Sequence, residues 1–156
     1  MKRTLILFPF LYMCFPSTFV SAQLVNNNAN LIGYFDGRTP CQEIAKQLNE
    51  PTIPECWKIK WRLTLYKNNG DTNSGTYSLE GFKFRGNNIL TGTWNIIKGT
   101  KTDPNAIVYQ LKNASHGLLY FLKADDNVLF FLDNDKNILV GNRNFSYALY
   151  RTIEDR

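Results

Sequence analysis

Residues 57–65 read Trp57-Lys58-Ile59-Lys60-Trp61-Arg62-Leu63-Thr64-Leu65. Apolar and polar side chains alternate at every step, which is the period of a β-strand that buries one face and exposes the other. The dry face carries Trp57, Ile59, Trp61, Leu63 and Leu65, and the wet face carries Lys58, Lys60, Arg62 and Thr64. The turn formers Asn68-Asn69-Gly70-Asp71 then predict a hairpin into a second strand over 76–84.

Outward from this hairpin, the chain is predicted to form further short strands separated by turn-forming residues. They are expected over 31–35, 89–98, 107–111, 118–122, 128–132, 138–140 and 145–150. Asp36-Gly37 and Pro40 are expected to end the first of them, and Gly92 marks a bend or a close backbone approach. Eleven Phe, eight Tyr and three Trp residues favour a β-rich core.

A single short helical segment interrupts this pattern near residues 41–49. Its apolar positions, Cys41, Ile44, Ala45 and Leu48, recur at helical spacing, and Pro51 and Pro54 follow them. The chain shows no repeating βα unit. An all-β fold class follows, with an antiparallel sheet closed into a small barrel or folded into a sandwich.

Residues 1–22 have the pattern of a secretory signal peptide. Lys2 and Arg3 precede an apolar run over 5–15, and Val20-Ser21-Ala22 is a small-residue cleavage site. The run is shorter than the roughly 20 residues of a membrane-spanning helix. Cys14 follows large Met13 in the middle of this segment, which disfavours a membrane lipid anchor through Cys14. The chain is therefore expected to be exported to the periplasm or outer cell envelope, with a flexible leader over 23–30 and one domain over 31–156.

Removal of this segment would leave two cysteines, Cys41 and Cys56, in an oxidising compartment. An even pair there predicts a disulfide. The alternative is a metal–thiolate site that uses Cys41, but the chain has no Cys-x-x-Cys motif and one histidine, His116.

The charge and the motifs of the chain argue against two function classes. The formal charge falls from +5 to about +3 when Lys2 and Arg3 are removed. Basic residues do not form a run of four, so we expect no nucleic-acid partner. The chain has no nucleophile elbow, phosphate loop or zinc-protease helix, and His116 lies in a predicted turn, so we expect no enzyme.

Three stretches resemble the NlpE-type copper-resistance proteins. They are Gly33-Tyr34-Phe35-Asp36-Gly37-Arg38-Thr39-Pro40-Cys41-Gln42-Glu43-Ile44, Gly92-Thr93-Trp94-Asn95-Ile96 and Asn127-Val128-Leu129-Phe130-Phe131-Leu132-Asp133. The resemblance implies a small antiparallel lipocalin-like β-barrel in the bacterial envelope, with a role in copper tolerance or envelope-stress sensing through envelope partner proteins. Copper is the cofactor that it suggests. Cys41 alone maps onto the family's Pro-Cys-x-x-Cys motif, because Ile44 occupies the second cysteine position.

A carrier of a small apolar ligand is the alternative function. In that case Trp57, Trp61, Tyr77 and Trp94 would line a ligand cup inside the barrel. The same aromatic side chains could instead fill the barrel as a packed core. The sequence favours the packed core but leaves both open.

Overall fold

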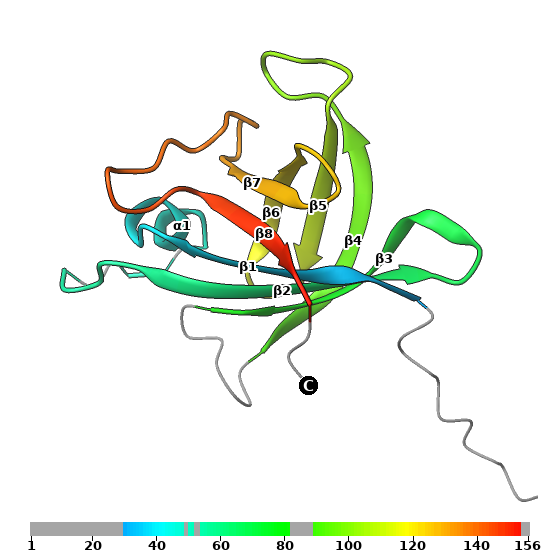
Figure 1. Ribbon diagram of the computed structural model, residues 1–156, viewed down its shortest axis with the longest axis horizontal. Helices are drawn as coiled ribbons and strands as arrows, with labels where there is room; N and C mark the ends of the chain where they lie inside the picture. The colour runs from blue at the N-terminus through cyan, green and yellow to red at the C-terminus, as the bar shows by residue number, and fades with distance from the viewer. Residues whose placement is uncertain (1–29, 49, 52–53, 82–88, 154–156) are drawn as a thin grey trace, which may run out of the picture.

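The computed structural model describes residues 30–48, 50–51, 54–81 and 89–153. The predicted signal peptide, Cys14, most of the leader and the turn expected at 86–88 lie outside these residues. Within them the chain forms eight strands and one helix (Figure 1). These are β1 (Leu31–Thr39), α1 (Gln42–Gln47), β2 (Ile59–Asn68), β3 (Asp71–Glu80), β4 (Leu90–Lys98), β5 (Ile107–Asn113), β6 (Gly117–Lys123), β7 (Val128–Leu132) and β8 (Ala148–Thr152).

The strands form one closed antiparallel barrel. Each strand pairs with the next along the chain, and β8 returns to pair with β1. This topology confirms the all-β, small antiparallel lipocalin-like barrel and rules out the sandwich. Closure pairs the two strands that would otherwise be the edges of the sheet.

The buried side chains of the strands fill the barrel interior. Leu63, Leu65, Leu79, Phe121 and Phe131 have no accessible surface. A cavity wide enough to hold water would leave accessible surface on the side chains that line it. The ring centroids of Phe121 and Phe131 are 4.4 Å apart. The interior is therefore packed with side chains.

The helix α1 covers one end of the barrel (Figure 1). Ile44 and Leu48 are buried against the core, as the helical spacing predicted. Gln47 Nε2 donates a hydrogen bond to the backbone oxygen of Leu132 at the end of β7, over 2.9 Å. The predicted helical segment is confirmed, although α1 is shorter than the expected range. No helix among the described residues is both long and apolar enough to cross a membrane.

Several strand boundaries differ from the expectation, and among them β3 begins at Asp71 and not at residue 76. β1 continues through Asp36 and Gly37 to Thr39, because Gly37 needs no side chain where the backbone of Ala148 approaches closely. The strand expected over 138–140 is reduced to a single bridge between Leu132 and Ile138. The last strand begins at Ala148 and not at residue 145. The predicted close approach at Gly92 is confirmed, since a Cβ there would meet the backbone oxygen of Lys112.

Candidate functional site

A disulfide joins Cys41 to Cys56, as predicted. It ties the start of α1 to the segment that precedes β2, with the two Cα atoms 6.0 Å apart and 15 positions apart in sequence. Cys41 is also the candidate copper ligand. Metals bind the cysteine thiolate, and a disulfide sulfur is not one, so Cys41 is not available as a ligand in this state. The described residues contain no cluster of three or more His, Cys, Asp or Glu side chains suited to a metal ion.

Three of the four aromatic residues proposed to line a cup lie inside the barrel. Trp61, Tyr77 and Trp94 are buried. The indole Nε1 of Trp61 donates to Thr39 Oγ1, and that of Trp94 donates to the backbone oxygen of Tyr66, each over 2.9 Å. Burial raises the pKa of Tyr77 to about 12. These contacts are typical of core residues and leave the rings packed.

Trp57 is the exception, and its predicted place on the inner face is wrong. Its side chain is 80% exposed. The alternation of residues 57–65 forms a strand only from Ile59 onward, where β2 begins. Trp57 precedes β2 and is not part of a barrel strand, so its side chain does not reach the interior.

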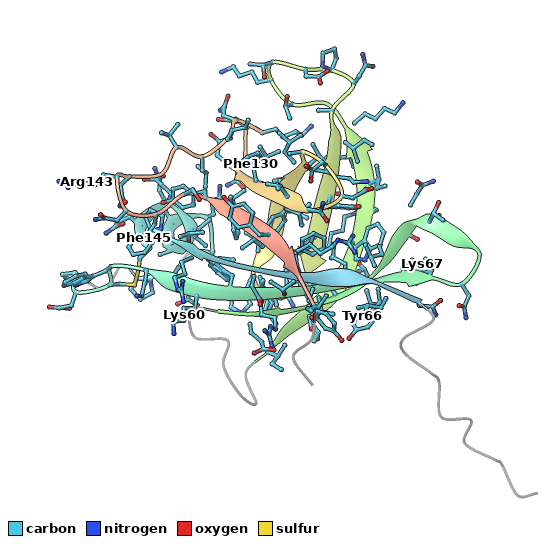
Figure 2. The ribbon with its side chains drawn as sticks, viewed as in Figure 1. Lys60, Tyr66, Lys67, Phe130, Arg143 and Phe145 are labelled. Carbon is cyan, nitrogen blue, oxygen red and sulfur yellow. A yellow bond between two sulfur atoms is a disulfide. The ribbon has the colours of Figure 1, made fainter. Side chains whose placement is uncertain are left out.

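The outer face of β1 and β2 carries an open hollow of about 580 Å³, which we call the β1–β2 groove. Its floor includes Arg38, Lys60 and Arg62, and its wall includes Asn144, Phe145 and Tyr150. In Figure 2, Lys60 and Phe145 lie toward the end of the molecule that carries the disulfide, whereas Tyr66 and Lys67 lie toward the other end of β2. Arg38 and Lys60 are exposed, so the groove opens on the outside of the barrel.

An ion pair between Asp36 and Arg62 lies at one side of the groove floor. Arg62 donates from Nε to Asp36 Oδ1 and from a terminal nitrogen to Oδ2, each over 2.9 Å. Thr152 Oγ1 donates to Oδ2 over 3.1 Å. The Arg62 hydrogen bonds, and to a lesser extent that from Thr152, lower the pKa of Asp36 below its ordinary value despite its partial burial. Both oxygens of this carboxylate are therefore already engaged.

The next cross-strand pair along the floor has two positive charges. Arg38 of β1 lies directly opposite Lys60 of β2. Both side chains are exposed, and neither makes an ion pair with a carboxylate among the described residues. Opposite residues on one face have Cβ atoms about 5 Å apart, and like charges there are destabilising. Among the described residues, therefore, no carboxylate neutralises the positive charge of this part of the floor.

The wall of the groove is held by a compact turn over 142–145. Asn142 Oδ1 accepts from the backbone nitrogens of Asn144 and Phe145 over 2.9 and 3.0 Å. The Lys58 ammonium lies 5.8 Å from the centroid of the Phe145 ring. Lys58 thus joins the wall to the start of β2 and adds a further positive charge beside the floor.

Sequence reasoning did not single out Arg38, Lys58 and Lys60. The alternate bases on the wet face, Lys58, Lys60 and Arg62, were a signal that could have been used. The position of Arg38 opposite Lys60 could not be found in this way, because it depends on the register between two strands.

His116 and the acidic segment after β7 have structural roles. The backbone nitrogen of His116 donates to Asn113 Oδ1 over 3.1 Å in the turn between β5 and β6. Asp133 accepts from the backbone and side-chain nitrogens of Asn137, each over 2.8 Å. These bonds form turns, as the sequence predicts for the stretch around His116.

Comparisons of this chain with protein-family models, curated proteins and solved structures give no match. The similarity to the NlpE-type proteins therefore stays a prediction from the residues quoted above.

Proposed function

We propose that this chain is an exported, non-enzymatic protein of the bacterial envelope that acts through contacts made by the outer face of its barrel. The observation that supports this is the contrast between a filled interior and the unneutralised Arg38–Lys60 pair on the groove floor. A filled barrel offers no internal chamber for a ligand. An exposed cationic groove is suited to contact with another molecule.

Export is supported by two independent features. Residues 1–22 have the charge, apolar length and cleavage pattern of a signal peptide. The Cys41–Cys56 disulfide is compatible with an oxidising compartment such as the periplasm.

Among the roles that the NlpE resemblance implies, envelope-stress sensing by contact fits this chain better than copper handling. The Cys41 sulfur is bonded to Cys56, and Ile44 stands at the second cysteine position. A Cu(I) titration of the reduced protein tests the copper role, with Cys41→Ser/Cys56→Ser as the control. Tighter binding by the reduced native pair than by the control would restore copper tolerance as the favoured role.

A carrier of a small apolar ligand remains the alternative function. The packing of Trp61, Tyr77 and Trp94 argues against it, because a ligand would have to displace these rings. An apolar fluorescent dye titrated into the native protein tests this alternative. Saturable binding that is weakened by Tyr77→Phe but not by changes in the groove would favour the carrier.

Expression of the full-length gene in a Gram-negative host tests the proposed location. We expect the protein in the periplasmic or envelope fraction, with a mass that corresponds to a chain starting at Gln23 and containing one disulfide. An unprocessed chain in the cytoplasm with both thiols free would contradict the proposal.

An envelope-stress reporter in a strain that lacks the gene tests the contact role. Complementation with Arg38→Glu/Lys60→Glu should fail to restore the response. The native chain and Lys112→Glu, an exposed change on β5, should restore it. Equal restoration by all three would show that the groove is not the contact surface.

A further inference from the structure

A row of bases, which we call the β2 row, lies on the outer face of β2 and just before it. Lys60 and Arg62 point outward from β2 at the two-residue step of a strand, and Lys58 lies just before β2 with its ammonium 5.8 Å from the centroid of the Phe145 ring. Residues two apart in an extended chain are about 6.6–6.8 Å apart. Arg62 is engaged by Asp36, so this ion pair marks one end of the open part of the row.

Arg38 widens this row into a two-strand surface. It lies across from Lys60, and both residues line the groove. An Arg guanidinium can grip a carboxylate with two parallel hydrogen bonds, while a Lys ammonium acts as a mobile point charge. The pair therefore offers one directional and one adaptable site for negative oxygen atoms.

The groove also supplies apolar contact beside these charges. Tyr150 is 52% exposed, and Phe145 lines the same groove. Tyr and Arg are among the residue types that contribute most of the binding energy at protein interfaces. The groove is an open hollow of about 580 Å³, so it has room for a short segment of chain.

We propose that the β1–β2 groove binds an extended acidic segment of a partner protein, with carboxylates at alternate positions that meet Lys58, Lys60 and Arg38. This inference rests on the proposed function, in which the outer face of the barrel makes the contacts. An extended segment repeats its side chains on one face with the same spacing as the bases of the β2 row. The Arg38–Lys60 repulsion is relieved when a carboxylate lies between the two charges.

Fluorescence polarisation with the processed protein tests this proposal. The protein is purified after expression of the full-length gene, and the probe is a labelled decapeptide that alternates glutamate with threonine. Arg38→Glu/Lys60→Glu should weaken binding at least about tenfold, because charge-assisted hydrogen bonds are replaced by repulsion. Lys112→Glu, the matched change on β5, should alter the affinity by less than about twofold. A twofold change corresponds to about 0.4 kcal/mol.

Further ligands show which chemical groups the groove recognises. A decapeptide with glutamine in place of glutamate should not bind, and one with its glutamates in a single block should bind more weakly than the alternating peptide. Preferential binding of polyphosphate or a heparin oligosaccharide at Arg38 and Lys60, with no binding of the alternating peptide, would overturn the proposal. Equal weakening by Lys112→Glu and the double variant would also overturn it.

Thermal unfolding separates loss of binding from loss of folding. The single variant Lys60→Glu places opposite charges across the two strands, so its unfolding midpoint should rise by about 1–4 °C. Reduced peptide affinity in a protein of raised midpoint supports a binding role for Lys60. If the peptide fails to bind a protein that is still exported and processed, this inference fails while the envelope location stands.

Discussion

The two faces of β2 differ in what stabilises them. On the inner face Ile59, Trp61, Leu63 and Leu65 are buried among the side chains of the other strands. On the outer face Arg62 is paired with Asp36, but Lys60 faces the like charge of Arg38. The inner face therefore supports the fold, whereas the outer face carries a charge pair that opposes it. Such a conflict between local chemistry and stability is expected at a functional surface.

The largest expected effect on stability is the difference between two tryptophans four residues apart, one buried and one exposed. Trp61→Ala removes a buried ring and its hydrogen bond to Thr39, so the free energy of unfolding should fall by about 3–5 kcal/mol. Trp57→Ala is the control, because the exposed Trp57 side chain should contribute no more than about 0.5 kcal/mol. Urea denaturation measures both. Similar losses for the two variants would contradict the assignment of Trp57 to the outside.

Removal of the disulfide should have the next largest effect. The Cys41–Cys56 bond closes a short loop between α1 and β2. Its loss in Cys41→Ser/Cys56→Ser should lower the free energy of unfolding by about 3 kcal/mol, because the unfolded chain gains freedom. Urea denaturation of this variant beside the native protein measures the change. A loss below about 1 kcal/mol would show that the bond contributes little to the fold.

The Asp36–Arg62 pair should make a smaller, pH-dependent contribution. The pKa of Asp36 is lowered in the folded protein, so its contribution is present above the ordinary value of 3.8 and is lost as the pH falls through the folded value. Because the pair is partly exposed, we expect about 1 kcal/mol or less. Urea denaturation at pH 7 and at pH 3 should show this loss in the native chain but not in Asp36→Asn. Asp135→Asn, an exposed turn residue, serves as the control, and equal pH dependence in all three proteins would contradict the role of the pair.

The smallest effect concerns the like charges themselves. Lys60→Glu should raise the free energy of unfolding by about 0.2–1 kcal/mol, because it replaces a repulsive cross-strand pair by an attractive one. Lys112→Glu controls for the change in net charge. The difference between the two variants should shrink in high salt, since the charges are exposed. Destabilisation by Lys60→Glu at low salt would mean that Arg38 does not repel Lys60.

Alternation and turn residues were sufficient to predict most of the strands, although they left the choice between a barrel and a sandwich open. The period of residues 59–65 places Ile59, Trp61, Leu63 and Leu65 inside, and the turn at 69–70 joins β2 to β3 as expected. The helical spacing around Ile44 and the even cysteine count likewise predicted α1 and the disulfide. Each of these features is encoded by neighbouring residues or by the chemistry of one residue type.

Features that depend on packing between distant segments could not be predicted. Asp36-Gly37 resembles a turn, yet it continues β1 because Arg62 and Thr152 bind the carboxylate and the backbone of Ala148 lies against Gly37. The groove depends on the register of Arg38 with Lys60, whose positions are separated by α1 and the disulfide loop. These bases therefore appeared scattered in the sequence.

We propose that the outer face of β2 serves binding at some expense of stability. The most direct measurement determines the unfolding midpoint and the affinity for the alternating glutamate peptide on the same preparation of Lys60→Glu. We predict a midpoint higher by about 1–4 °C and an affinity lower by about fivefold, which corresponds to roughly 1 kcal/mol. An unchanged affinity, or a fall in both quantities, would contradict the claim.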